Sequence, residues 1–163
     1  MYDSISEKVG ESGLVVAIEP HPENYEFLLR NIKLNSLKNV IALNMAAWDS
    51  ETDLKLFVGD KHGHHNIKKD FSLGSLVVRA KPLDEILTEL GVERVDFIKI
   101  DVEGSELEVL RGLTRTLKRY RPKVVVEIWG DPREVEKLMD QLEYGMRQIA
   151  PQYYVLEYFA ISK

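Results

Sequence analysis

The sequence contains no cysteine among its 163 residues. This absence excludes disulfide bonds, zinc sites with thiolate ligands and catalysis by a thiol. No stretch approaches the ~18 consecutive apolar residues of a membrane span. Residues 1–7 have neither a basic start nor an apolar run, so they do not predict a signal peptide. We therefore expect a cytoplasmic protein with no membrane partner.

An excess of positive charge is also missing, because the formal net charge is −5. Nucleic-acid-binding surfaces need clustered lysine and arginine, so we expect no nucleic-acid partner. The densest basic run, residues 115–121, fits the last turns of a helix, where cations interact favourably with the helix dipole. The length and the 44% hydrophobic content predict one domain over residues 1–163.

Buried strands and amphipathic helices alternate along much of the chain, which is typical of an α/β domain with a mostly parallel sheet. Two strands near the carboxyl terminus, joined by a turn near Pro151, predict an antiparallel end to that sheet. The expected strands are 14–18, 40–44, 54–58, 75–79, 96–100, 123–128, 144–149 and 153–161, and the expected helices are 2–9, 22–34, 82–90, 106–120 and 132–142.

A long polar loop, Gly59 to Gly74, interrupts this alternation between two strands and predicts a β-excursion over a functional site. It contains His62, His64 and His65. Adjacent histidines in a polar loop are more often exposed than metal-bound, and no carboxylate spacing completes a ligand set, so we predict no metal. An imidazole titrates near neutral pH, which makes His65 a candidate proton acceptor.

Acidic and amide side chains follow three predicted strands, as Glu19, Asn44 and Asp101. Ligands of open α/β sheets bind outside the carboxyl ends of the strands. Asp101 and Glu103 lie at such an end, and burying two clustered carboxylates is costly unless they have a partner. A carboxylate in the position of Glu19 fits the ribose of a nucleotide, although loop polarity explains a Glu-Pro pair equally well.

Two charges interrupt otherwise apolar strands, Lys99 in one and Glu127 in another. Side chains alternate between the faces of a strand, so Lys99 and Asp101 share a face that Glu127 can reach from a neighbouring strand. A structural ion pair between Lys99 and Glu127 and a catalytic role for Glu127 both remain open.

Five segments together resemble the FkbM family of S-adenosylmethionine-dependent methyltransferases, and the resemblance extends over nearly the whole chain. The most specific part is the Lys-Ile-Asp-Val-Glu-Gly block with its following Ser-Glu-Leu. The segments are Val16-Ala-Ile-Glu-Pro-His-Pro-Glu-Asn-Tyr25, Leu28-Leu-Arg-Asn31 with Leu34-Asn35, Asn44-Met-Ala-Ala47, Leu83-Asp-Glu85 and Ile98-Lys-Ile-Asp-Val-Glu-Gly-Ser-Glu-Leu-Glu-Val-Leu-Arg-Gly112.

The resemblance implies a Rossmann-like fold and O-methylation of a small molecule or sugar, with S-adenosylmethionine as the cofactor. Glu19 is then expected to bind the cofactor's ribose, and His21 and the turn from Asn44 to Ala46 to line its adenine. Asp101 and Glu103 are expected to face the methionine moiety and the acceptor. We hypothesise that one of them is the catalytic base, with His65 in reserve. No Asn/Asp-Pro-Pro-Tyr motif follows the central strand, which argues against methylation of amino groups.

The sequence departs from the family at its start. Such methyltransferases begin with a strand and a glycine-rich turn, and this sequence shows neither, so it resembles a family member without its first strand. That strand lies in the middle of the sheet. We therefore expect the strands ending at Glu19 and Asp101 either to close up against each other or to recruit another copy of the chain, giving a homo-oligomer.

Two other functions remain as alternatives. A catalytically silent or truncated domain, acting as a binding or assembly module, predicts no affinity for S-adenosylmethionine. A nucleotide-binding oxidoreductase needs a Gly-x-Gly-x-x-Gly turn ahead of Glu19, and the sequence has none there.

Overall fold

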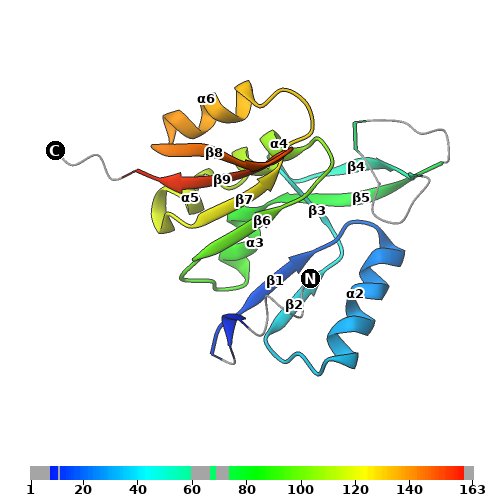
Figure 1. Ribbon diagram of the computed structural model, residues 1–163. Coiled ribbons are helices and arrows are strands. Elements are labelled where there is room, and N and C mark those ends of the chain that lie inside the picture. The colour runs from blue at the N-terminus through cyan, green and yellow to red at the C-terminus, as the bar shows by residue number, and fades with distance from the viewer. Residues whose placement is uncertain (1–7, 11, 60–66, 69–73, 160–163) are drawn as a thin grey trace.

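The computed structural model describes residues 8–10, 12–59, 67–68 and 74–159 (Figure 1). Strands and helices alternate through most of this part, as the sequence predicts. The elements in chain order are β1 (Val15–Ile18), α2 (Pro22–Leu34), β2 (Val40–Leu43), β3 (Ala46–Trp48), β4 (Thr52–Phe57), β5 (Ser75–Pro82), α3 (Leu83–Glu89), β6 (Phe97–Ile100), α4 (Glu106–Arg111), α5 (Thr114–Tyr120), β7 (Lys123–Glu127), α6 (Arg133–Gln141), β8 (Tyr144–Ala150) and β9 (Tyr153–Tyr158). No helix in these described ranges is both long and apolar enough to cross a bilayer.

The strands form three sheets. The largest has the order β6-β7-β9-β8, in which β6 and β7 are parallel and β9 runs antiparallel to both of its neighbours. A parallel pair, β1 and β2, forms the second sheet, and the third has the order β3-β5-β4. The predicted α/β class and the antiparallel carboxyl-terminal end are confirmed.

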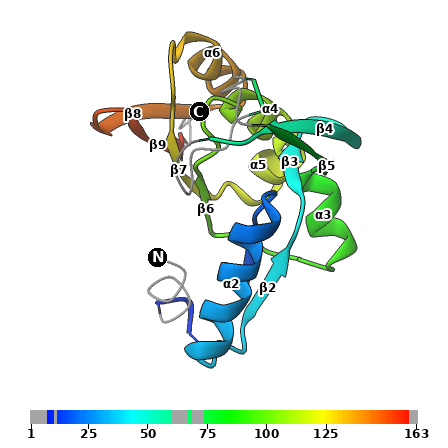
Figure 2. The same ribbon diagram turned by 90° about the vertical axis from the view of Figure 1, so that its right-hand side faces the viewer.

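The main core lies between the four-stranded sheet and helices α4, α5 and α6. All four strands contribute to it, and in the Val-Val-Val run of β7 both Val124 and Val126 are fully buried. In both views α6 lies over β8 and β9 (Figures 1 and 2). The helices and the break between α4 and α5 contribute residues that are equally inaccessible to solvent, namely Leu110, Leu113, Leu117 and Met139.

The strands that end at Glu19 and Asp101 do not close up against each other, so that part of the expectation is wrong. Among the described residues, β1 is hydrogen-bonded to β2 alone and β6 to β7 alone. Two residues separate β2 from β3, and β3 is held in another sheet by its pairing with β5. This short linker attaches the β1–β2 pair to the sheet that contains β3, and neither β1 nor β2 pairs with β6 in the described residues. Both strands therefore present an open edge in the described structure.

The expected β-excursion is present as β4 and β5, which pair antiparallel. Residues 60–66 and 69–73 of the loop between them lie outside the described residues. Lys68 of that loop forms an ion pair with Glu108 of α4, with 2.9 Å between Nζ and Oε2. This contact brings the described part of the loop to the helix that follows Asp101, which agrees with a location near the predicted site.

The single helix expected over 106–120 is wrong, because the chain forms two helices separated at Gly112 and Leu113. Gly112 packs so closely on the Trp48 carbonyl that a β-carbon there would overlap it. The buried carboxylate of Asp84 then accepts the backbone N–H groups of Arg115 and Thr116, both at 2.8 Å. It thereby satisfies two of the amides that begin α5. The Leu83-Asp84-Glu85 segment thus includes a helix-capping residue.

The close approach at Gly112 predicts a large effect of a single methyl group. We expect Gly112→Ala to lower the free energy of unfolding by at least about 2 kcal/mol, because rigid backbone must move to admit the β-carbon. Gly91→Asn is the control, since a β-carbon there meets nothing within 4 Å and asparagine tolerates its φ of +66°. Urea unfolding that gives equal losses for the two variants would contradict this explanation of the helix break.

Candidate functional site

Ionisable side chains gather where β6 and β7 end. Ile100 pairs with Val126 in the register, so Asp101 and Glu127 follow as the next two residues on adjacent strands. Glu127 in turn lies opposite Tyr153 of β9. The Lys99 ammonium is 2.6 Å from the Asp101 carboxylate. The sequence left open an ion pair between Lys99 and Glu127, and the structure pairs Lys99 with Asp101.

Glu127 has an unusual environment for a carboxyl group. Partial burial raises its pKa above the ordinary 4.5, and this effect outweighs the hydrogen bond that it accepts from Tyr153. A hydrogen bond with the Asp101 carboxyl group and the negative charge of Glu103 raise its pKa further. The hydrogen bond to Glu127 raises the pKa of Tyr153 in turn. Glu127 therefore retains its proton to a higher pH than an ordinary glutamate, beside the Asp101 carboxylate that pairs with Lys99.

The loop after β6 contains two successive residues with positive φ, Glu103 at 53° and Gly104 at 101°. The second value is strained for a side chain, so glycine is required there even though the space around it is open. These two residues turn the chain from β6 into α4. The turn leaves Asp101 and Glu103 at the carboxyl end of the strand, where the sequence predicted them.

Glu19 follows β1 in the same way that Asp101 follows β6, and in Figure 1 both strands run towards the same side of the molecule. Its Oε1 accepts the backbone N–H of His21 at 2.9 Å. Burial raises the pKa of Glu19, while hydrogen bonds from His21 and from the Asn24 side chain oppose the rise. The carboxylate is therefore oriented by donors of its own turn, and the His21 side chain beside it is buried.

The two remaining residues predicted for the adenine have structural contacts. Asn44 donates from Nδ2 to the carbonyl oxygens of Glu19 and Pro20, at 2.9 and 3.1 Å, and so fixes the turn that carries Glu19. Ala46 does not belong to a turn, as the sequence analysis expected, because it is the first residue of β3. Its side chain packs in a small core with Leu56 and Val78, and it is only 3% exposed.

The structure thus brings the predicted residues together in two groups. Asp101 and Glu103 lie with Glu127 and Tyr153 at the carboxyl ends of the four-stranded sheet. Glu19 and Asn44, with His21 near them, lie at the end of the β1–β2 pair. The remaining candidate, His65, lies outside the described residues. Within the described part of the chain, no group of three or more histidine, aspartate or glutamate residues is arranged to hold a metal ion.

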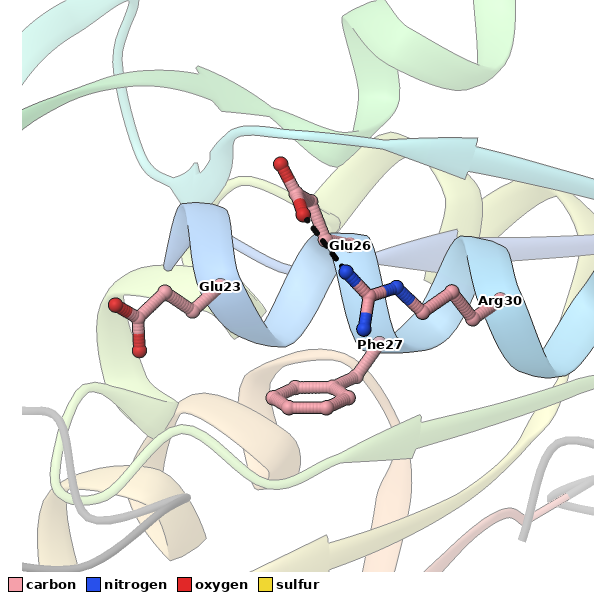
Figure 3. Close-up of a pocket in the computed structure, with 4 residues that line it drawn as sticks. All are labelled: Glu23, Glu26, Phe27 and Arg30. Carbon is pink, nitrogen blue, oxygen red and sulfur yellow. Dashed lines mark hydrogen bonds and ion pairs between the residues drawn. The ribbon is translucent and has the colours of Figure 1, made fainter.

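A pocket of ≈ 180 Å³ lies elsewhere, on the surface of α2 (Figure 3). Phe27 projects from the helix beneath the Arg30 guanidinium, whose carbon is 5.6 Å from the ring centroid, and Arg30 also pairs with Glu26. Pockets for small ligands usually measure about 300–1,000 Å³. The pocket is too small for a nucleoside cofactor, and no predicted site residue lines it.

Tyr153 and Glu106 lie at the site but were not predicted from the sequence to belong to it. Tyr153 meets Glu127 only through the register of β9 on β7, which a sequence does not reveal. Glu106 was quoted within the family segment without a role, yet it is a carboxylate only 3% exposed at the start of α4. The sequence offered one indication of this, namely a glutamate at the first position of an amphipathic helix.

Comparison with known proteins gives consistent results. Residues 2–148 match the family model for the Methyltransferase FkbM domain. The hexuronic acid methyltransferase AglP of Haloferax volcanii is 31% identical over 131 residues, which are 78% of this chain and 53% of that protein. Methyltransferase sdnD of Sordaria araneosa is also 31% identical, over 77% of this chain and 62% of that protein.

A solved structure, the methyltransferase FkbM from Methylobacillus flagellatus KT, shares the fold with a TM-score of 0.63 at 19% identity. The match covers 89% of this chain and 36% of that one. The chain therefore spans little more than half the length of the curated relatives described above.

The raised pKa of Glu127 predicts a pH dependence of stability. Between the ordinary value of 4.5 and the raised value, the folded chain binds more protons than the unfolded chain, so the free energy of unfolding falls as the pH rises through this window. We expect Glu127→Gln to remove part of that fall in urea unfolding measured from about pH 4 to 7.

Glu157→Gln on β9 is the control, because its ion pair with Lys123 lowers the pKa of Glu157. Its small contribution has the opposite sign, since it is present above the ordinary pKa and is lost as the pH falls through the lowered value. An unchanged pH slope in Glu127→Gln would show that Glu127 does not hold the extra proton.

Proposed function

The chain belongs to the FkbM methyltransferase family, and from this we propose that it transfers a methyl group from S-adenosylmethionine to a hydroxyl group of a small molecule or sugar. The observation that carries the proposal is the group of Asp101, Glu103 and Glu127 at the carboxyl ends of β6 and β7 in a chain of this family. Two relatives with methyltransferase names, one of them a hexuronic acid methyltransferase, support the reaction class.

The polar groups at the end of β1 suit the ribose of the proposed cofactor. Glu19 is a partly buried carboxylate oriented by His21 and Asn24, and such a carboxylate accepts hydrogen bonds from ribose hydroxyl groups. Asn44 fixes the turn that presents it. We propose that His21 lies against the adenine. Ala46 acts only through its backbone, because its side chain belongs to the core.

When bound, S-adenosylmethionine supplies an activated methyl group on a positively charged sulfur. Alignment of the acceptor with that group is the main task of the protein, and well-held alignment is worth up to ~7–11 kcal/mol. The acceptor hydroxyl must also lose a proton, for which a positioned base typically adds ~10²–10⁴-fold. Asp101 and Glu103 are the proposed bases, and His65 remains the reserve candidate.

The contacts of Asp101 suit it to this role. Lys99 stabilises its charge at 2.6 Å, while the neighbouring Glu127 shares a hydrogen bond with it. In this proposal the proton taken from the acceptor passes to Asp101, which lies next to Glu127, a carboxyl group with a raised pKa. Tyr153 donates a hydrogen bond to Glu127.

The open edges of β1 and β6 support a further part of the proposal. Unpaired strand edges within an α/β domain favour the addition of another strand. We propose that the 163-residue chain, treated as one family domain, associates through these edges into a homo-oligomer.

Substitution of the proposed base tests the function most simply. Asp101→Asn and Glu103→Gln are assayed with S-adenosylmethionine and a panel of sugars as acceptors. We expect the variant that lacks the base to lose ~10²–10⁴-fold in kcat. Asp96→Asn is the matched control, because Asp96 precedes the same strand at its other end and pairs with the exposed Arg94. Full turnover in both site variants would remove both carboxylates from the base role.

Cofactor affinity provides an independent test. We expect Glu19→Gln to weaken binding of S-adenosylmethionine by about tenfold to a hundredfold in calorimetry, since a hydrogen bond to a charged group is worth about 1.5–3 kcal/mol. Glu26→Gln, in an exposed pair on α2, is the control. If the unsubstituted chain binds no S-adenosylmethionine, the silent binding module becomes the better description.

A further inference from the structure

Glu106 is a carboxylate in an environment that disfavours its charge. It is 3% exposed, and burial raises its pKa. A buried carboxylate is costly unless hydrogen-bond donors surround it. The backbone N–H of Gly104 donates a hydrogen bond to Oε1 of Glu106 at 2.7 Å. The backbone N–H groups of Glu106 itself and of Trp129 also lie close enough to the carboxylate to lower its pKa.

These amides come from two different loops. Gly104 belongs to the loop between β6 and α4, which also contains Asp101 and Glu103. Trp129 belongs to the loop between β7 and α6, two residues after Glu127. Because β6 and β7 are adjacent parallel strands, one side chain joins the loops at the ends of both.

The first of these loops needs such a restraint. Glu103 and Gly104 have positive φ angles, 53° and 101°, and this conformation is unfavourable for glutamate without support from its surroundings. Gly104 N–H is held by Glu106 at the end of that turn. Glu108 on the same helix forms a partly exposed ion pair with Lys68.

We propose that Glu106 is a positioning residue, whose buried carboxylate clamps the β6–α4 and β7–α6 loops together and thereby holds Asp101, Glu103 and Glu127 in their catalytic arrangement. The effect of Glu106 on catalysis rests on the proposed methyl transfer, whereas its contact with the two loops does not. A glutamine in this position keeps the size of the side chain but replaces an acceptor oxygen with a donor NH₂ group facing backbone N–H groups. Such a substitution loosens the loops without removing any group that touches a substrate.

The experiment compares the full 163-residue chain with Glu106→Gln and with Glu108→Gln as the control on the same helix. Hydrogen exchange reports the clamp, and we expect the Gly104 and Trp129 amides to exchange about tenfold faster in Glu106→Gln. Carbon-detected NMR titration reports the arrangement, and we expect the pKa of Glu127 to move towards its ordinary value as the contact with Asp101 loosens. Glu108→Gln leaves both measurements unchanged.

Steady-state kinetics adds a readout of positioning. We expect Glu106→Gln to lower kcat by about tenfold to a hundredfold, because small displacements of reacting groups are costly, with the KM for S-adenosylmethionine within twofold of the unsubstituted chain. Unchanged exchange at both amides would overturn the clamp. Faster exchange with an unchanged Glu127 titration and unchanged kcat would make Glu106 merely structural. Faster exchange and a shifted titration in a chain without any methyl transfer would support positioning and refute the proposed reaction.

Discussion

The arrangement of the site depends on the cost of holding several carboxyl groups close together at the edge of one sheet. Parallel pairing of β6 and β7 places Asp101 and Glu127 on adjacent strand ends, where their charges repel. Three interactions reduce that cost, namely the Lys99 ion pair with Asp101, the Tyr153 hydrogen bond to Glu127 and the hydrogen bond between the two carboxyl groups. Acidic groups retained at such a cost are typical of functional sites.

The surrounding structure is organised by contacts between loops and helix ends. Asp84 begins α5 by accepting two of its amides, and Glu106 joins the loops that follow β6 and β7. Gly112 allows the end of α4 to approach the Trp48 carbonyl, which links the four-stranded sheet's helices to β3. Acidic residues of the family segments therefore divide into those that support the backbone and those that remain for chemistry. Asp84 and Glu106 belong to the first kind, and Asp101 is the residue that we propose for the second.

Local patterns in the sequence predicted most of the elements and the strand ends at which acidic residues collect. Features that depend on contacts distant in sequence were not predictable. The β1–β2 pair stays apart from β6 because of its short tether to β3, which is itself fixed by pairing with β5. Lys99 reaches Asp101 on its own strand rather than Glu127, and Ala46 enters a core instead of a turn. Tyr153 joined the site through the register of a distant hairpin.

We propose that the strand ends at Glu19 and at Asp101 bind one ligand between them. The most direct measurement is the change in backbone NMR shifts when the demethylated cofactor, S-adenosylhomocysteine, is added to the chain. We expect shift changes concentrated in residues 19–24 and 101–104, two segments far apart in sequence. Changes confined to the outer surface of α2 around Phe27 and Arg30, or no changes at saturating ligand, would contradict it.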